Sequence, residues 1–264
     1  MKKILRTLYK IQVWTCFIVF FLLLYPFFVL FIQRDSWKAK GHFLNKIWAY
    51  SVFGYCFLPC EVIFHFKPKK KTPYIYCSNH NSYLDIPSLC YALPGYFKFI
   101  GKAALTKVPL FGYMFRNLYI PVDRHNKRSK YETMQMSFQA IDEGRGLAIF
   151  PEGTIPKGNH PHMIPFKDGP FRIAIEKKAP IVPVTLPYNW IILPDDGTYT
   201  PNRHLMKVIV HEPIETTHMT LDDVGALKNK TYNIIRDELK KHFPEKFIET
   251  ENGVVDQVTG RESF

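Results

Sequence analysis

Apolar positions divide the chain into an N-terminal stretch with long apolar runs and a longer part with short ones. The first run, residues 11–32, reads IQVWTCFIVFFLLLYPFFVLFI and contains no charge. A helix rises about 1.5 Å per residue, so this run is long enough for a hydrocarbon core of roughly 30 Å. A second, weaker run covers residues 47–66 and is interrupted by Pro59 and Glu61. We therefore predict that residues 1–71 form a membrane anchor built from a helical pair.

Basic residues around these runs indicate how the anchor meets the membrane. They form clusters before the first run, between the runs and after the second: Lys2, Lys3, Arg6 and Lys10; Arg34, Lys38, Lys40 and Lys46; Lys67, Lys69, Lys70 and Lys71. All three clusters prefer the cytoplasmic side, and a spanning hairpin would place the middle one outside. We therefore expect a pair that lies in, or only partly crosses, the inner leaflet, with a kink at Pro26. A single transmembrane helix is the alternative.

From residue 72 onward, short β-rich runs alternate with helical patterns. The predicted strands are residues 74–77, 97–100, 118–122, 147–150, 181–186 and 207–211, and the predicted helices are residues 85–92, 110–117, 130–143, 171–178 and 221–243. Thr220 is a suitable cap for the last helix. The alternation predicts an α/β domain over residues 72–248, with a mostly parallel sheet flanked by helices. The polar residues 249–264 are expected to form a C-terminal tail.

Composition and charge narrow the function classes. Hydrophobic residues make up 47% of the 264 residues, which excludes intrinsic disorder. The net charge is +12, and residues 1–71 account for +10 of it, with twelve Lys and Arg against Asp35 and Glu61. This placement favours an anionic membrane surface over a nucleic acid as the partner. Five cysteines without a CxxC pair indicate neither a disulfide framework nor a zinc site.

The first motif that can carry chemistry, Ser78-Asn79-His80-Asn81-Ser82-Tyr83-Leu84-Asp85, follows a predicted strand. On one helix, residues five apart point about 140° away from each other. His80 and Asp85 therefore meet only if His80 lies in the loop and Asp85 on the first helical turn. A histidine held by a carboxylate can act as a general base. Ser82 and Asp85 also have the spacing of a capping box, which explains Asp85 without catalysis.

Four further stretches follow this motif along the chain. In the stretch Phe150-Pro151-Glu152-Gly153-Thr154, Pro and Gly allow a sharp turn that would display Glu152 and Thr154 at the sheet edge; a plain turn is the alternative. Residues 120–124 form a strand that runs into Asp123 and Arg124, within a basic stretch that suits a phosphate or is simply solvated. Residues 165–169, which include Lys167, precede a helix, and core packing explains most of residues 181–184.

Taken in order, these motifs resemble the glycerolipid acyltransferase family, whose type member is 1-acylglycerol-3-phosphate acyltransferase. The family pattern is NHxxxxD, an Arg-bearing strand, FPEGTR and a proline-containing apolar strand. The corresponding stretches are Asn79-His80 with Asp85, Val122-Asp123-Arg124, Phe150-Pro151-Glu152-Gly153-Thr154 and Ile181-Val182-Pro183-Val184. The resemblance covers about residues 74–190.

The resemblance implies a transfer of an acyl group to a lysolipid. His80, oriented by Asp85, would deprotonate the acceptor hydroxyl, which attacks the thioester of acyl carrier protein or coenzyme A. The residues implied in acceptor binding are Asn79, Arg124, Glu152, Gly153, Thr154 and Lys167. No cofactor and no metal is implied. The protein would act at the cytoplasmic face of the inner or plasma membrane, bound to anionic lipid, and its oligomeric state stays open.

One departure from the family pattern concerns the acceptor. Where the family has Arg after the EGT turn, this chain has Ile155, and an apolar side chain does not replace a guanidinium–phosphate pair. Arg124, Lys157 or Lys167 would then compensate for a lysophosphatidate acceptor, or the acceptor is a lyso-aminolipid built on ornithine or glycine. The alternatives from other classes are a lipid-binding protein without turnover and a nucleic-acid-binding protein, which the charge distribution disfavours.

Overall fold

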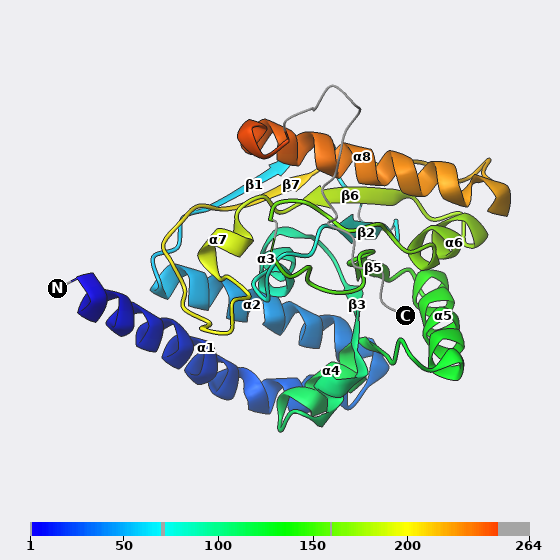
Figure 1. The fold of residues 1–264 in the computed structure, drawn as a ribbon. Helices are drawn as coiled ribbons and strands as arrows, with labels where there is room; N and C mark the ends of the chain where they lie inside the picture. The colour runs from blue at the N-terminus through cyan, green and yellow to red at the C-terminus, as the bar shows by residue number, and fades with distance from the viewer. Residues whose placement is uncertain (1, 70–71, 159, 248–264) are drawn as a thin grey trace.

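A computed structural model describes residues 2–69, 72–158 and 160–247, which form a seven-stranded sheet with helices on both faces (Figure 1). The strands are β1 (Cys60–Phe64), β2 (Ile75–Ser78), β3 (Phe97–Lys102), β4 (Ile120–Val122), β5 (Gly146–Ile149), β6 (Ile181–Thr185) and β7 (Met206–Val210). The α-helices are α1 (Lys2–Ile32), α2 (Lys38–Tyr55), α3 (Asp85–Ala92), α4 (Phe111–Leu118), α5 (Lys127–Asp142), α6 (Gly169–Glu176), α7 (Asn189–Ile192) and α8 (Val224–His242). Short 3-10 helices are η1 (Asp35–Trp37), η2 (Ala103–Lys107), η3 (Leu221–Asp223) and η4 (Pro244–Lys246).

The strand order is β1-β7-β6-β2-β5-β3-β4. The five strands from β6 to β4 run parallel to one another, so their carboxyl ends meet at one edge of the sheet. Strand β7 is antiparallel to β6, and β1 is parallel to β7. The structure confirms the expected α/β class with a mostly parallel sheet.

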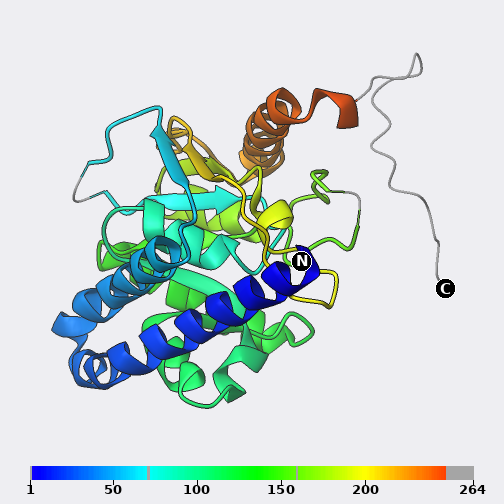
Figure 2. The ribbon, with the colours of Figure 1, turned by 90° about the vertical axis from the view of Figure 1, so that its left-hand side faces the viewer.

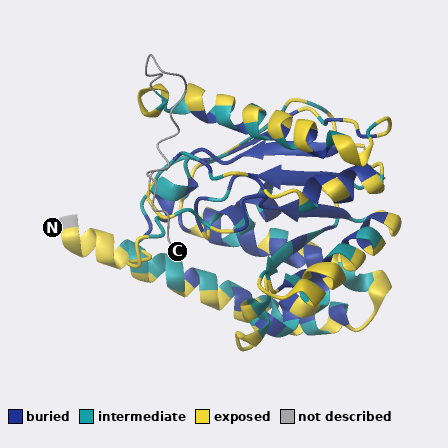
Figure 3. Ribbon diagram, turned by 45° about the vertical axis from the view of Figure 1, so that its right-hand side comes forward, coloured by how far each residue is buried: buried dark blue, intermediate teal, exposed yellow. Residues whose placement is uncertain are grey.

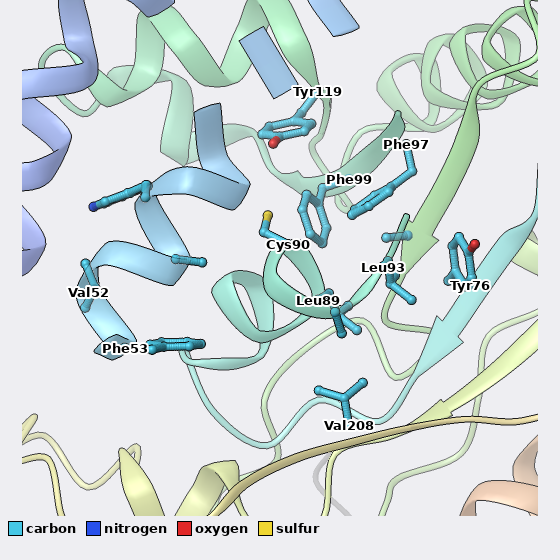
Figure 4. Packing of buried hydrophobic residues seen from close by; sticks show 14 of the residues in the cluster. Val52, Phe53, Tyr76, Leu89, Cys90, Leu93, Phe97, Phe99, Tyr119 and Val208 are labelled. Atoms are coloured by element: carbon cyan, nitrogen blue, oxygen red, sulfur yellow. The ribbon is translucent and has the colours of Figure 1, made fainter. Parts of the chain in front are cut away.

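Side chains alternate along the central strands between two apolar cores. On one face, Tyr76, Phe97 and Phe99 pack with buried residues of α1 to α4, and Figure 4 shows part of this cluster. On the other face, Ile75 and Cys77 join buried residues of α5, α6 and α8. Because both faces are covered, the strands have no regularly exposed positions, as is usual for parallel sheets.

Every strand and helix predicted for the α/β part is present, and each begins and ends within three residues of its predicted bounds. Strand β1 and helix α7 were not predicted. Helix α5 begins at Lys127, three residues early, because the Asn126 side chain accepts a hydrogen bond from Ser129 N at 3.2 Å. Before α8, Thr220 and Asp223 form a capping box that opens η3. Residues 249–264 lie outside the described residues, and the division of the chain into three parts stays a prediction.

The N-terminal part contains two helices, as expected, but the second is placed differently. Helix α2 ends at Tyr55, and after Pro59 the second apolar run becomes the edge strand β1. The prediction of a membrane helix over residues 47–66 is therefore wrong for its second half. The strand pairs with β7, and Glu61 forms an ion pair with Lys207 at 3.1 Å, which explains a charge within an apolar run.

Helix α1 has one face against the domain and one apolar face outside. It lies beside α2 and α4 (Figure 2), with Phe21, Phe28 and Ile32 buried. Many of its other apolar side chains are exposed, Leu23 to 63% (Figure 3). Among the described residues, Lys3–Ile32 is the one stretch of helix long and apolar enough to cross a membrane.

The contact of η2 with α4 generates a testable prediction. A Cβ at Gly112 would lie 2.2 Å from the Thr106 carbonyl oxygen, and a backbone atom cannot give way as a flexible side chain does. We expect Gly112→Ala to lower the melting temperature by roughly 5 °C or more, because overpacking costs about 1–3 kcal/mol. Gly54→Ala is the matched control, because a Cβ there meets nothing within 4 Å. Equal melting curves for the two variants would contradict the close approach.

Candidate active site

The polar motifs of the sequence come together at the edge where the parallel strands end. The loop after β2 carries His80, the turn after β5 carries Glu152, and Arg124 follows β4. The segment after β6 brings Asn189, the first residue of α7, to the same edge. Carboxyl ends of strands in such sheets are the usual place for a binding site.

His80 and Asp85 are in direct contact. His80 Nδ1 lies 2.8 Å from Asp85 Oδ2, with His80 in the loop and Asp85 as the first residue of α3. The same oxygen accepts hydrogen bonds from the backbone N–H groups of Asn81 at 2.7 Å and Ser82 at 3.0 Å. The Asp85 carboxyl group is completely buried and receives N–H donors from several sides, an arrangement that suits its ionised form.

This geometry determines the tautomer of the histidine. Because an ionised carboxylate can only accept, Nδ1 of His80 carries the hydrogen and Nε2 has a free lone pair. Half of the predicted capping box is also present. Asp85 accepts from Ser82 N, whereas the Ser82 hydroxyl donates to Leu193 O at 2.7 Å. Asp85 thus both holds the loop before α3 and orients the imidazole.

The imidazole of His80 is held from its other side by the turn after β5. Its ring stacks on Phe150 with centroids 4.0 Å apart and planes at 14°. Glu152 accepts hydrogen bonds from the backbone N–H of His80 at 2.7 Å and of Ile164 at 3.0 Å. The Glu152 side chain is buried, and desolvation raises its pKa to about 8 against the opposing effect of these two bonds. It therefore supports the loop from inside the fold.

Asn79 also serves the fold. Its amide group donates to Leu186 O at 3.0 Å and accepts from Leu186 N at 2.8 Å, as a neighbouring strand would. Asn81 donates to the same carbonyl at 3.0 Å. These bonds tie the loop after β2 to the segment after β6, and they engage both the oxygen and the nitrogen of the Asn79 side chain.

Three of the predicted cationic and small residues lie together beside the histidine loop. Gly153 has φ +79°, and a Cβ there would lie 2.9 Å from Lys167 Cε and 3.9 Å from Arg124 Cζ. Only glycine allows this turn and this close approach. Within residues 2–69, 72–158 and 160–247, neither Arg124 nor Lys167 has an ion pair with a carboxylate. Their charges are therefore available to an anionic group.

A large apolar cavity of about 870 Å³ opens onto this site. Its lining includes the polar side chains of His80, Lys102, Arg124, Thr154 and Lys157, and also Ile155, the departure from the family pattern. Its walls come from α1, α2, α3, η2 and α4, with Trp14, Trp48 and Phe111 among the large side chains. A cavity of this size and lining can hold a long apolar chain with a polar group near His80.

Sequence reasoning identified His80, Asp85, Arg124 and Gly153 as neighbours, but it did not identify Asn189. Its side-chain N–H group donates to Asp85 Oδ1 at 2.9 Å although the two residues are 104 positions apart. Phe150, which stacks on His80, lies inside one of the sequence motifs. The sequence therefore indicated that it is near the site, but not that it contacts His80. The catalytic and binding roles of all these residues stay predictions.

Comparisons with known proteins agree with this fold. A model of the acyltransferase family matches residues 61–187. The 1-acyl-sn-glycerol-3-phosphate acyltransferase BAT2 of Brassica napus is 33% identical over 193 residues, which is 72% of this chain and 54% of that protein. The 1-acyl-sn-glycerol-3-phosphate acyltransferase of Saccharomyces cerevisiae is 33% identical over 175 residues, 65% of this chain and 57% of that protein.

A solved structure of similar fold is that of the 1-acyl-sn-glycerophosphate acyltransferase PlsC from Thermotoga maritima. It has a TM-score of 0.72 and covers 92% of this chain and 98% of its own, at 20% identity. The chain belongs to the acyltransferase family. It spans somewhat more than half the length of the curated relatives that it matches most strongly.

The buried Glu152 predicts how stability depends on pH. The folded chain keeps this proton up to about pH 8, whereas the unfolded chain releases it near the ordinary value of 4.5. Unfolding between these pH values releases a proton, so raising the pH favours unfolding. We expect the melting temperature to fall between about pH 5 and pH 8 and to fall less steeply in Glu152→Gln.

Below about pH 5 the variant should be less stable by about 1–3 kcal/mol, because an amide nitrogen cannot accept from a backbone N–H group. Thermal unfolding at matched pH values measures both effects. Parallel curves for the two proteins would show that Glu152 does not exchange a proton in this range.

Proposed function

We propose that the protein is a membrane-bound acyltransferase that moves a fatty acyl group from a thioester to the free hydroxyl of a lysolipid, with 1-acylglycerol-3-phosphate as the acceptor. The observation that carries the proposal is the contact between His80, which lines the apolar cavity, and the buried Asp85. The names of the relatives support the acceptor, since several are 1-acyl-sn-glycerol-3-phosphate acyltransferases.

In the proposed reaction, Nε2 of His80 removes the proton of the acceptor hydroxyl while its oxygen attacks the thioester carbon. The tetrahedral intermediate expels a thiolate, which takes the proton from the imidazolium, so the products are an ester and a free thiol. Asp85 holds the imidazole in the required tautomer and stabilises the imidazolium. No acyl-enzyme forms in this scheme, and acyl carrier protein or coenzyme A carries the donor acyl group.

The acceptor headgroup is proposed to bind at the cationic side of the cavity. Arg124 and Lys157 line this end, and Lys167 lies over Gly153 next to Arg124. Charge-assisted bonds from a guanidinium and an ammonium suit a phosphate monoester. Thr154 would add a hydroxyl. Asn79 and Glu152 act in this scheme through the loop that they support, since their polar atoms are bonded within the fold.

The lipid chains are proposed to reach the cavity from the membrane. Helix α1 forms part of the cavity wall, and its opposite face is apolar and exposed along much of its length. A helix packed lengthwise on the domain fits a position in the membrane surface better than a perpendicular span. We therefore place α1 in the inner leaflet, with the basic clusters toward anionic headgroups at the cytoplasmic face of the inner or plasma membrane.

Substitutions of the pair test the proposal. His80→Ala should reduce turnover at least 1,000-fold, because general-base transfer is lost, and Asp85→Asn should reduce it at least 100-fold through the wrong tautomer. The measurement is the initial rate of lysophosphatidate acylation by the detergent-solubilised protein. His218→Ala, at an exposed histidine, is the control and should keep the wild-type rate. A stable Asp85→Asn protein with a near-normal rate would leave Asp85 as a helix cap only.

Ile155 favours a second candidate acceptor, a lyso-aminolipid of the ornithine or glycine type. It lines the cavity at the place where the family pattern has Arg, so this end has one guanidinium less. An aminolipid headgroup without phosphate needs no such clamp. The two acceptors, offered side by side with acyl carrier protein and coenzyme A thioesters, separate the candidates.

Substitutions at Arg124 and at Ile155 should change the KM for a phosphate-bearing acceptor in opposite directions. Arg124→Ala should raise the KM for lysophosphatidate about 10-fold or more with a smaller change in kcat, because a bond to a charged group is worth about 1.5–3 kcal/mol. Ile155→Arg should lower that KM and leave the KM for an aminolipid unchanged. An unchanged KM in Arg124→Ala would mean that the phosphate binds elsewhere. Absence of turnover with both acceptors would favour a lipid-binding protein without turnover.

A further inference from the structure

Asn189 stands out because its side chain meets the catalytic carboxylate from the side opposite to the histidine loop. It is completely buried at the start of α7 and donates to Asp85 Oδ1 at 2.9 Å and to Ser88 Oγ at 3.1 Å. Among the described residues, no other donor is within hydrogen-bond distance of Asp85 Oδ1. The two oxygens of the carboxylate are therefore held separately, Oδ2 by the loop after β2 and Oδ1 by Asn189.

The orientation of the Asn189 amide group leaves one polar atom without a hydrogen bond, and the contact with Asp85 explains why this orientation is nevertheless adopted. Its oxygen is buried and has no hydrogen-bond partner in the described part of the chain. Such an unpaired buried group costs about 1–3 kcal/mol. Turning the amide over would place its oxygen against Asp85 Oδ1, where two acceptors repel. The fold therefore keeps a donor on the carboxylate and leaves the amide oxygen unpaired, unlike Asn79, which uses both ends.

The surroundings of α7 keep this donor in place. Leu193, which follows α7, accepts from the Ser82 hydroxyl at 2.7 Å and donates its N–H to Asn189 O at 2.9 Å. Asn202 donates to the carbonyl oxygen of a different residue of α7, Ile191, at 2.9 Å, and this bond involves neither Asn189 nor Asp85. The contact between Asn189 and Asp85 thus belongs to a hydrogen-bonded connection between the segment after β6 and the histidine loop.

We propose that Asn189 is a positioning residue for the His80–Asp85 base. It keeps the carboxylate from rotating, so that Oδ2 faces Nδ1 of His80. It also stabilises the competent protonation state, a neutral imidazole beside an ionised carboxylate, because that state has a net negative charge that an N–H donor favours. The proposal rests on the proposed function in one respect, that His80 is the base of the reaction.

The test compares Asn189→Ala with two matched variants of the full-length, detergent-solubilised protein. Asn202→Ala removes a hydrogen bond to the same helix without touching Asp85, and Ser88→Ala removes the other partner of Asn189. In Asn189→Ala we expect kcat to fall about 10-fold and the KM values for acceptor and donor to change less than 2-fold. The acid limb of the pH–rate profile should move up by roughly half a pH unit or more, because the net-negative state has lost a donor. Both controls should keep the wild-type profile.

A second measurement does not depend on turnover. Diethyl pyrocarbonate modifies neutral imidazoles, and peptide mass spectrometry resolves the modification of His80 from that of the other histidines. The pH at which His80 becomes reactive should move up in Asn189→Ala in parallel with the acid limb. Asn189→Asp keeps the side-chain volume and puts an acceptor against Asp85 Oδ1, so it should move the reactive pH in the same direction and further, even if the alanine variant fails to fold.

Unchanged kcat and unchanged reactive pH in Asn189→Ala would overturn the proposal. A lower melting temperature with a normal pH profile would do the same, since it leaves Asn189 a structural role alone. If the wild-type protein acylates no lysolipid, the proposed function fails, while the reactivity of His80 still decides whether Asn189 controls the pair.

Discussion

The site depends on one buried negative charge, the carboxylate of Asp85. Burying an ionised carboxyl group is costly unless hydrogen bonds replace the lost water, and here N–H groups approach both of its oxygens. Three of these donors come from residues 80–82 and one from Asn189. The conformation of the loop after β2, the start of α3 and the placement of α7 are therefore set by the same requirement. The imidazole receives its orientation from that arrangement.

Cationic and apolar side chains face one cavity beside this pair. Arg124 and Lys157 line the cavity and Lys167 lies next to Arg124, all three without carboxylate partners in the described ranges, whereas much of the wall toward the N-terminal helices is apolar. The parallel direction of β6 to β4 is what brings the polar loops to one edge. A molecule with an anionic head and an apolar chain matches both environments, with its junction near the imidazole.

Local patterns in the sequence predicted much of this fold, because the signals for strands, helices and turns are carried by neighbouring residues. The meeting of His80 with Asp85 followed from a spacing of five. Features that depend on contacts between residues far apart in the sequence could not be predicted in this way. Strand β1 reads as a weak helical run, and its partner β7 begins at Met206. Asn189 has no spacing signal, since its contact with Asp85 depends on where β6 lies in the sheet.

The same limit applies to the roles inside the quoted motifs. Asn79 and Glu152 were assigned to acceptor binding together with their neighbours in the motif. Burial and main-chain bonding, which place them behind the loop and not in the cavity, are properties of the folded chain. A sequence motif contains residues that the fold brings close together. It does not show which of them contact a ligand and which only hold the ligand-binding residues in position.

The N-terminal helices, which we propose as the membrane anchor, also form part of the cavity wall. Because α1 and α2 line the cavity, they complete the space beside His80. Replacing α1 by an unrelated hydrophobic helix would change the wall of that space along one side. Helix α1 is therefore not an interchangeable module, and its sequence is constrained on its inner face by the shape of what the cavity encloses.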